Sequence, residues 1–251
     1  MEKANKYKYL LHLGDQSMIL GHRLSELCGH GPSLETDIAL TNISLDLFGQ
    51  VRNFFQYAAE IGTEEETEDS IAFLRLEREY CSSVLLEQPN TDFAHVIIRQ
   101  YLFDVFQLMQ LEFLIESSDS RIAAICHKAI KETKYHKRFS EAWVIRLGLG
   151  TETSNQKMQD ALNHLYPFCS ELLKATQIEI EADQESYGIN PEKFSDAYYS
   201  EIKQTFNSAG LQIEDTPQRM VNGKTGIHSE HMGPILSSLQ YMQRTYPNMQ
   251  W

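Results

Sequence analysis

Acidic residues stand at helical spacing within otherwise apolar stretches of this sequence. One such residue lies in each of four expected helices: Asp15, Asp46, Asp104 and Glu132. His136 follows Glu132 by four positions, so these two side chains share one helix face. Carboxylates and imidazoles that point inward from four helices are the ligands of a di-iron site in a helix bundle. The pattern therefore makes oxygen-activating di-metal chemistry the first hypothesis.

The spacing of the histidines argues against a working di-iron site. Such sites take a Glu-x-x-His motif from each of two helices, and this motif is absent from the sequence. The residues three positions after the four acids are Met18, Gly49, Gln107 and Tyr135. The single acid-x-x-His is Asp92-x-x-His95, and it falls at the start of an expected helix.

Two interpretations of the acids stay open. In the first, they pair with Arg, His or Asn in a buried polar network, because an unpaired buried carboxylate is costly. In the second, the chain is a free-standing di-metal oxygenase with atypical ligands: Asp46, Asp104, Glu132 and His136. The ligand count favours the first interpretation, since the second supplies one imidazole where di-iron sites use two.

Two further motifs resemble binding sites without meeting their requirements. Gly223-Lys224-Thr225 matches the end of a phosphate-binding loop, but Gln218 stands where that loop needs a glycine and no strand is expected before it. A surface loop is predicted instead. His228, Glu230 and His231 are close together without a further ligand at metal-binding spacing, which favours a hydrogen-bonded loop anchor.

Charge and composition limit the partners of this chain. A formal net charge of −13 would repel nucleic acid over most of the surface, although a local basic patch remains possible and an anionic ligand would need one. No apolar run approaches the length of about 18 residues that spans a bilayer, and the N-terminus has no apolar signal core. We therefore expect no membrane insertion and a cytoplasmic location.

Nearly the whole chain is expected to be helical, as one all-α domain over residues 1–251. The long helices are expected at about 7–27, 35–61, 92–116 and 119–147, with a crossover helix at about 64–87. Additional C-terminal helices are expected at about 154–175, kinked at Pro167, and at 191–208 and 232–245. The alternating stretch 178–181 is isolated and is expected to be a loop. Four long helices with one long crossover predict a ferritin-like bundle.

Several blocks of the sequence resemble, in order, the C subunits of bacterial phenylacetyl-CoA epoxidases. These blocks are residues 45–54, 87–90, 99–101, 131–139 and 226–234. The resemblance extends over essentially the whole chain. A set of blocks in the same order is far more specific than any single motif.

The resemblance implies a ferritin-like fold and a role in aerobic phenylacetate breakdown. It also implies that a paralogous A subunit holds the di-iron centre, while a reductase with flavin and iron–sulfur groups delivers electrons from NADPH. The C subunit is then a structural partner of the A subunit, with no catalytic residue, cofactor or metal of its own, and other epoxidase components as further partners. Alone, we expect it to form a homodimer. Asp46/Gly49 and Thr133/His136 would be remnants of the two Glu-x-x-His motifs.

Overall fold

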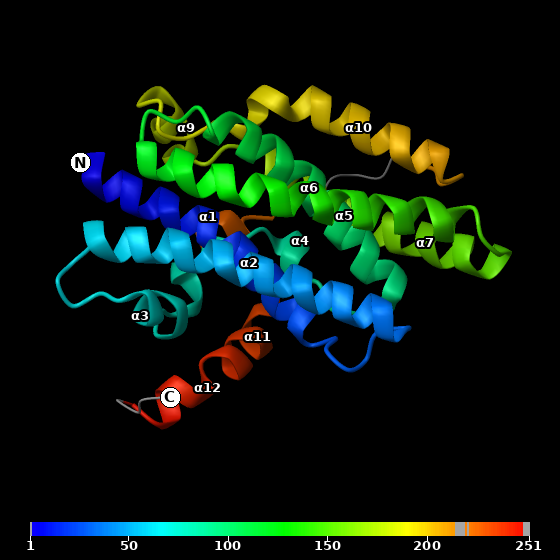
Figure 1. Cartoon of the computed structure of the whole chain (residues 1–251), viewed down its shortest axis with the longest axis horizontal. Helices are drawn as coiled ribbons and strands as arrows, with labels where there is room; N and C mark the ends of the chain where they lie inside the picture. Colours follow the sequence, from blue (N-terminus) through cyan, green and yellow to red (C-terminus); the bar gives the residue numbers. More distant parts are fainter. Residues whose placement is uncertain (1, 214–218, 220, 248–251) are drawn as a thin grey trace.

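The long helices form a bundle of two antiparallel pairs (Figure 1). The computed structural model describes residues 2–213, 219 and 221–247. In it, α1 (Glu2–Ser25) packs along α2 (Leu34–Ile61), α5 (Phe93–Leu114) packs along α6 (Ser120–Gly148), and α2 contacts α6. No strand occurs in the described ranges, where the one β-type contact is an isolated bridge between Asn222 and Ile227. The predicted all-α fold is confirmed.

Short polar side chains start three of these helices. Ser33, Asp92 and Asp119 accept hydrogen bonds from the first free backbone N–H groups of α2, α5 and α6. These N-caps replace partners that the first turn of a helix lacks. The Asp92-x-x-His95 motif is thus a helix cap, in which the carboxylate accepts from the His95 backbone.

The segment between the two helix pairs is not the single helix expected at 64–87. It consists of α3 (Glu68–Phe73), the 3₁₀ turn η1 (Glu77–Glu79) and α4 (Val84–Glu87). A capping box between Thr67 and Ser70 starts α3, and Leu76 and Tyr80 have extended backbones. Polar groups of this crossover segment bind other parts of the molecule, and these tertiary contacts override the local helix preference.

The C-terminal half adds short helices around the bundle. These are α7 (Glu152–Leu165), η2 (Tyr166–Phe168), α8 (Cys169–Leu173), α9 (Gln177–Gln184), η3 (Pro191–Phe194), α10 (Ser195–Ser208), η4 (Gly223–Thr225), α11 (Met232–Leu239) and α12 (Tyr241–Thr245). The expected break at Pro167 falls in η2. The loop expected at 178–181 is wrong, because a capping box between Thr176 and Glu179 starts a helix there.

The central helix of the molecule is α5. Every residue from Val96 to Gln107 is buried, and α5 contacts α4, α6, α7 and α10. Polar side chains on this helix must therefore find partners inside the protein. No helix among the described residues is both long and apolar enough to cross a membrane.

Candidate functional site

A layer of neutral polar side chains crosses the middle of the bundle. It takes one residue from each long helix: Ser17, Gln50, Gln107 and Thr133. The Gln107 amide donates to Gln50 Oε1 at 2.9 Å and to Ser17 Oγ at 3.1 Å. Thr133 Oγ1 donates to Gln107 Oε1 at 3.3 Å. All four residues are buried, and these hydrogen bonds join the two helix pairs.

Sequence reasoning missed this layer because it considered only acids and histidines on the apolar stripes. Gln50 and Gln107 carry the signal that would have revealed it, since each stands on an apolar helix face and a buried amide needs internal partners. Thr133, one of the predicted remnants, does lie in the layer. From α2, however, the layer takes Gln50 and not Asp46, the other predicted remnant.

Asp15 lies outside the layer and is paired with an arginine. Arg75 binds both oxygens of this buried carboxylate through two guanidinium nitrogens, with Nη1 at 2.9 Å from Oδ2. The Cys81 backbone N–H donates to the same oxygen at 2.8 Å. The Arg75 guanidinium lies 4.1 Å from the centre of the Tyr80 ring. Asp15 therefore fastens α1 to the crossover segment, as the polar-network interpretation expects.

Asp104 is fully buried on α5, and its hydrogen bonds come from neutral groups. Gln100 Nε2 donates to Oδ1 at 2.6 Å, and Ser140 Oγ donates to Oδ2 at 2.7 Å. Burial raises the pKa of the Asp104 carboxyl to about 7, because the two hydrogen bonds and the more distant cations compensate only part of the lost hydration.

The remaining candidates, Asp46, Glu132 and His136, gather where α2 and α6 meet. His136 Nε2 lies 3.0 Å from Asp46 Oδ2, and the imidazole is buried whereas the Asp46 side chain is 37% exposed. Burial, together with the nearby charge of Asp46, raises the pKa of the Glu132 carboxyl. The five predicted residues are thus divided among three separate places in the bundle.

The side chains present do not fit a di-iron centre. Within the part of the chain that the structure describes, no three or more His, Cys, Asp and Glu side chains are placed so that they can hold a metal ion. The central layer offers amides and hydroxyls, whereas di-iron sites need several carboxylates and two imidazoles. No chemical step is therefore assigned to a metal in this chain.

The Gly223-Lys224-Thr225 motif does not form a phosphate-binding loop. Lys224 is buried and forms a 2.8 Å ion pair with Glu179, while its amine also donates to the Leu172 and Lys174 carbonyls. The prediction of a surface loop is wrong for Lys224, because the Lys224 side chain is buried and its amine binds acceptors inside the protein.

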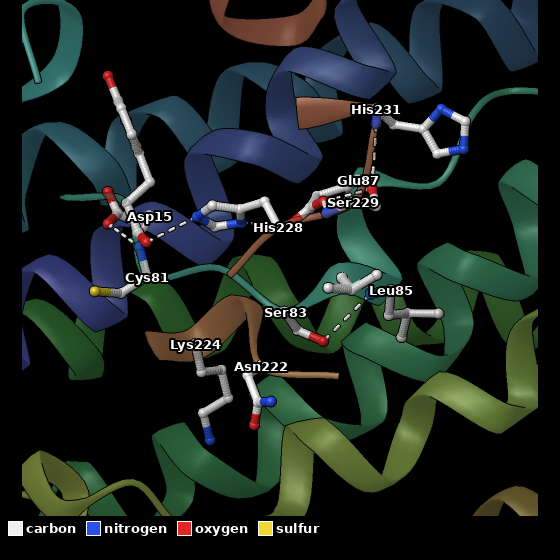
Figure 2. Close-up of polar contacts among 12 residues, drawn as sticks. Asp15, Cys81, Ser83, Leu85, Glu87, Asn222, Lys224, His228, Ser229 and His231 are labelled. Carbon is white, nitrogen blue, oxygen red and sulfur yellow. Dashed lines mark hydrogen bonds and ion pairs between the residues drawn. The ribbon is translucent and has the colours of Figure 1, made fainter. Parts of the chain in front are cut away.

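The predicted loop anchor around His228 is confirmed (Figure 2). His228 Nδ1 lies 2.6 Å from Glu87 Oε1, and Nε2 lies 3.0 Å from the Tyr80 carbonyl oxygen. The Ser229 backbone and hydroxyl both donate to the other oxygen of Glu87. Glu87 thus ties the segment before α11 to the crossover segment.

Comparison with known proteins agrees with this architecture. A family model described as "Phenylacetic acid catabolic protein" matches residues 1–251. The C subunit of the 1,2-phenylacetyl-CoA epoxidase from Escherichia coli K12 is 46% identical over 243 residues, which cover 97% of this chain and 98% of that protein. The predicted resemblance is confirmed, and so is the ferritin-like class of the helical bundle. This chain belongs to the phenylacetic acid catabolic protein family.

Proposed function

We propose that this chain is a non-catalytic structural subunit of a multicomponent ring 1,2-phenylacetyl-CoA epoxidase. In this proposal it works in the cytoplasm, where it pairs with the di-iron catalytic A subunit and stabilises it. Electrons come from NADPH through a reductase that carries flavin and an iron–sulfur group. The substrate and the membership of a larger enzyme are those that the relative's name gives for the relative.

The neutral layer at the centre of the bundle carries the proposal. Ser17, Gln50, Gln107 and Thr133 come one from each long helix, as the ligands of a di-iron bundle do, but they bind one another. A buried hydrogen-bond network of this kind can stabilise a bundle without any metal. The layer is therefore suited to a structural role.

An exposed apolar face on α2 supports the pairing. Leu34, Ile38 and Leu45 are 72%, 53% and 62% exposed and share one side of the helix. Large apolar side chains that gather on one exposed face mark association surfaces. We propose that this face binds the A subunit, and that it binds a second copy of the chain when the A subunit is absent.

Iron analysis tests the non-catalytic role directly. The purified chain is incubated anaerobically with ferrous iron, desalted and analysed for metal. We expect far less than one iron per chain. Binding of about two irons per chain, lost in the variant Glu132→Ala, would instead establish the atypical di-metal site.

Co-expression with the A-type paralogue tests the structural role. We expect a stable complex on size-exclusion chromatography, and more soluble A subunit than when it is expressed alone. If no complex forms and the A subunit is equally soluble and active alone, the chain is not its structural partner.

A further inference from the structure

We infer that the pocket between η2 and the segment before α11 binds the phosphate group of a small molecule. Arg219, His164 and His231 line this pocket, which has a volume of about 370 Å³. This inference is independent of the proposed structural role, because it concerns a different part of the molecule.

One aromatic ring organises the cationic side of the pocket. The Arg219 guanidinium carbon lies 4.9 Å from the centre of the Phe168 ring, and the His164 ring centre lies 6.3 Å from it. The Arg219 backbone N–H donates to the Pro167 carbonyl at 2.8 Å, which fixes this residue against η2. His164 and Arg219 are therefore brought to the same wall by α7 and η2.

The other imidazoles approach from different elements. The His95 ring, at the start of α5, lies behind His164 with 5.4 Å between ring centres. His231 also lines the pocket, and its backbone N–H donates to Ser229 Oγ at 3.3 Å. Figure 2 shows His231 at the end of the segment that Glu87 holds through His228 and Ser229. The pocket is thus supported by the bundle on one side and by the loop anchor on the other.

Among the described residues around this pocket, arginine and histidine side chains outnumber the carboxylates. His95 is paired with Asp92 at 2.7 Å, near Lys157, and His228 is paired with Glu87. His231 has only the exposed Glu230 carboxylate at 3.9 Å. Among the described residues, neither Arg219 nor His164 has an ion-pair partner. Within the described part of this chain, whose net charge is −13, Glu230 is the carboxylate that lines the pocket beside Arg219 and the imidazoles.

Electrostatic repulsion between these groups is visible at His164. Burial lowers the pKa of the His164 imidazole, and the positive charges of His95, Arg219 and His231 lower it further. A bound anion would remove this repulsion and favour the protonated imidazole. Binding should therefore take up a proton and strengthen as the pH falls.

The pocket's shape and donors identify a phosphate. Guanidinium groups pair with phosphate through parallel hydrogen bonds, and protonated imidazoles add further donors. The volume lies within the range of about 300–1,000 Å³ that is usual for small-molecule sites, so it exceeds what a bare anion needs. Phe168, Val84 and Val221 provide an apolar wall for an organic group next to the phosphate. These features favour a phosphate ester or diphosphate over free phosphate.

Isothermal titration calorimetry on the full chain tests this inference. The probes are inorganic phosphate, pyrophosphate and coenzyme A, the last of which combines a phosphate ester with a diphosphate. We expect saturable binding that strengthens from about pH 8 to about pH 6. Arg219→Gln should weaken binding by about tenfold or more.

Arg146→Gln is a matched control, because Arg146 is also exposed and lies 5.1 Å from the centre of the Trp143 ring, outside the pocket. It should leave binding nearly unchanged. His164→Gln provides a second variant and should weaken binding and remove most of its pH dependence.

The probes also separate the two sources of phosphate. Tighter binding of coenzyme A than of pyrophosphate assigns the pocket to an organic phosphate, whereas equal or weaker binding of coenzyme A assigns it to a free phosphate or diphosphate. Absence of saturable binding by all three probes overturns the inference. Equal losses in Arg219→Gln and Arg146→Gln would also overturn it, since they would indicate attraction by overall charge.

Discussion

Asp104 lies in α5, where every residue from Val96 to Gln107 is buried, and within the described residues its carboxylate accepts hydrogen bonds from Gln100 and Ser140. A buried carboxylate without an adjacent cation favours its neutral form. Asp15 illustrates the opposite case, because Arg75 binds both of its oxygens. The same residue type therefore joins two elements through an ion pair in one place and has a pKa raised to about 7 in the other.

The raised pKa of Asp104 makes stability depend on pH. Between about pH 4 and pH 7 the folded chain keeps a proton that the unfolded chain has released, so the free energy of unfolding falls as the pH rises through this window. Asp104→Asn keeps the side chain neutral and should remove this loss. We expect the variant to be more stable than the wild type above pH 7, by about 1–3 kcal/mol, with the difference shrinking toward pH 4.

Urea unfolding followed by circular dichroism at several pH values measures this effect. Asp160→Asn is a suitable control, because Asp160 also accepts a hydrogen bond from a glutamine four positions earlier but is exposed. The control should follow the wild type at every pH. Parallel curves for wild type and Asp104→Asn would show that Asp104 is ionised in the folded state.

The sequence identified most residues that need internal partners but not the partners themselves. Asp15, Asp104 and His136 were recognisable because they stand on apolar stripes, whose period predicts burial. Their partners come from elements distant in sequence: Arg75 is 60 residues from Asp15, and Ser140 is 36 residues from Asp104. Local spacing holds no information on such pairs. The sequence could therefore predict that a buried polar network exists, but not which residues pair within it.

At the scale of elements, the long helices follow from their caps and apolar periods, whereas the crossover segment does not. Arg75 donates through Nε to the Ile71 carbonyl and through its guanidinium to Asp15, while Glu87 binds the segment before α11. Through these contacts the crossover segment binds α1 and the C-terminal segment, and it folds as short helices joined by extended residues. Its structure depends on the whole fold, which explains why a helix over 64–87 was wrong.

The Glu87 anchor predicts how the C-terminal segment responds to pH. Both ring nitrogens of His228 face acceptors, the Glu87 carboxylate and the Tyr80 carbonyl, so the ring satisfies both only when doubly protonated. Burial alone would lower the pKa of His228, but the hydrogen bond and charge of Glu87 outweigh it and raise that pKa. The stabilisation is complete below about pH 6.5 and is lost as the pH rises through the raised pKa.

We therefore expect Glu87→Gln to lower the free energy needed to open the C-terminal segment by about 1–2 kcal/mol at pH 6.5 and below. The substitution should also abolish the pH dependence of this opening. Hydrogen exchange of the α11 amides, corrected for the intrinsic effect of pH, measures the release. Glu230→Gln should have no effect, since the Glu230 side chain is 85% exposed. Unchanged protection of α11 in Glu87→Gln would mean that the apolar contacts of α11 alone hold the segment.

The whole molecule combines a hydrogen-bonded polar layer in its interior with an exposed apolar face on α2. Hydrogen bonds join Ser17, Gln50, Gln107 and Thr133 at the bundle centre. Among the described residues, no three or more His, Cys, Asp and Glu side chains are placed so that they can hold a metal ion. The outer side of α2, by contrast, leaves Leu34, Ile38 and Leu45 exposed to solvent. A molecule built in this way is suited to association, which is the basis for expecting the A subunit on this face.

Placing a charge on this face should prevent the association. Leu45→Lys puts an ammonium group in the middle of the apolar surface, and a buried unpaired charge in an interface is strongly unfavourable. Leu149→Lys is the matched control, because Leu149 is 63% exposed, nearly the same as Leu45, but lies at the end of α6. In co-expression with the A-type paralogue, we expect Leu45→Lys to reduce the recovered complex by about tenfold or more, while Leu149→Lys leaves it unchanged.

Thermal unfolding of the isolated variants should be close to that of the wild type, since both side chains are exposed. Full recovery of the complex with Leu45→Lys would place the A subunit on another face of the bundle.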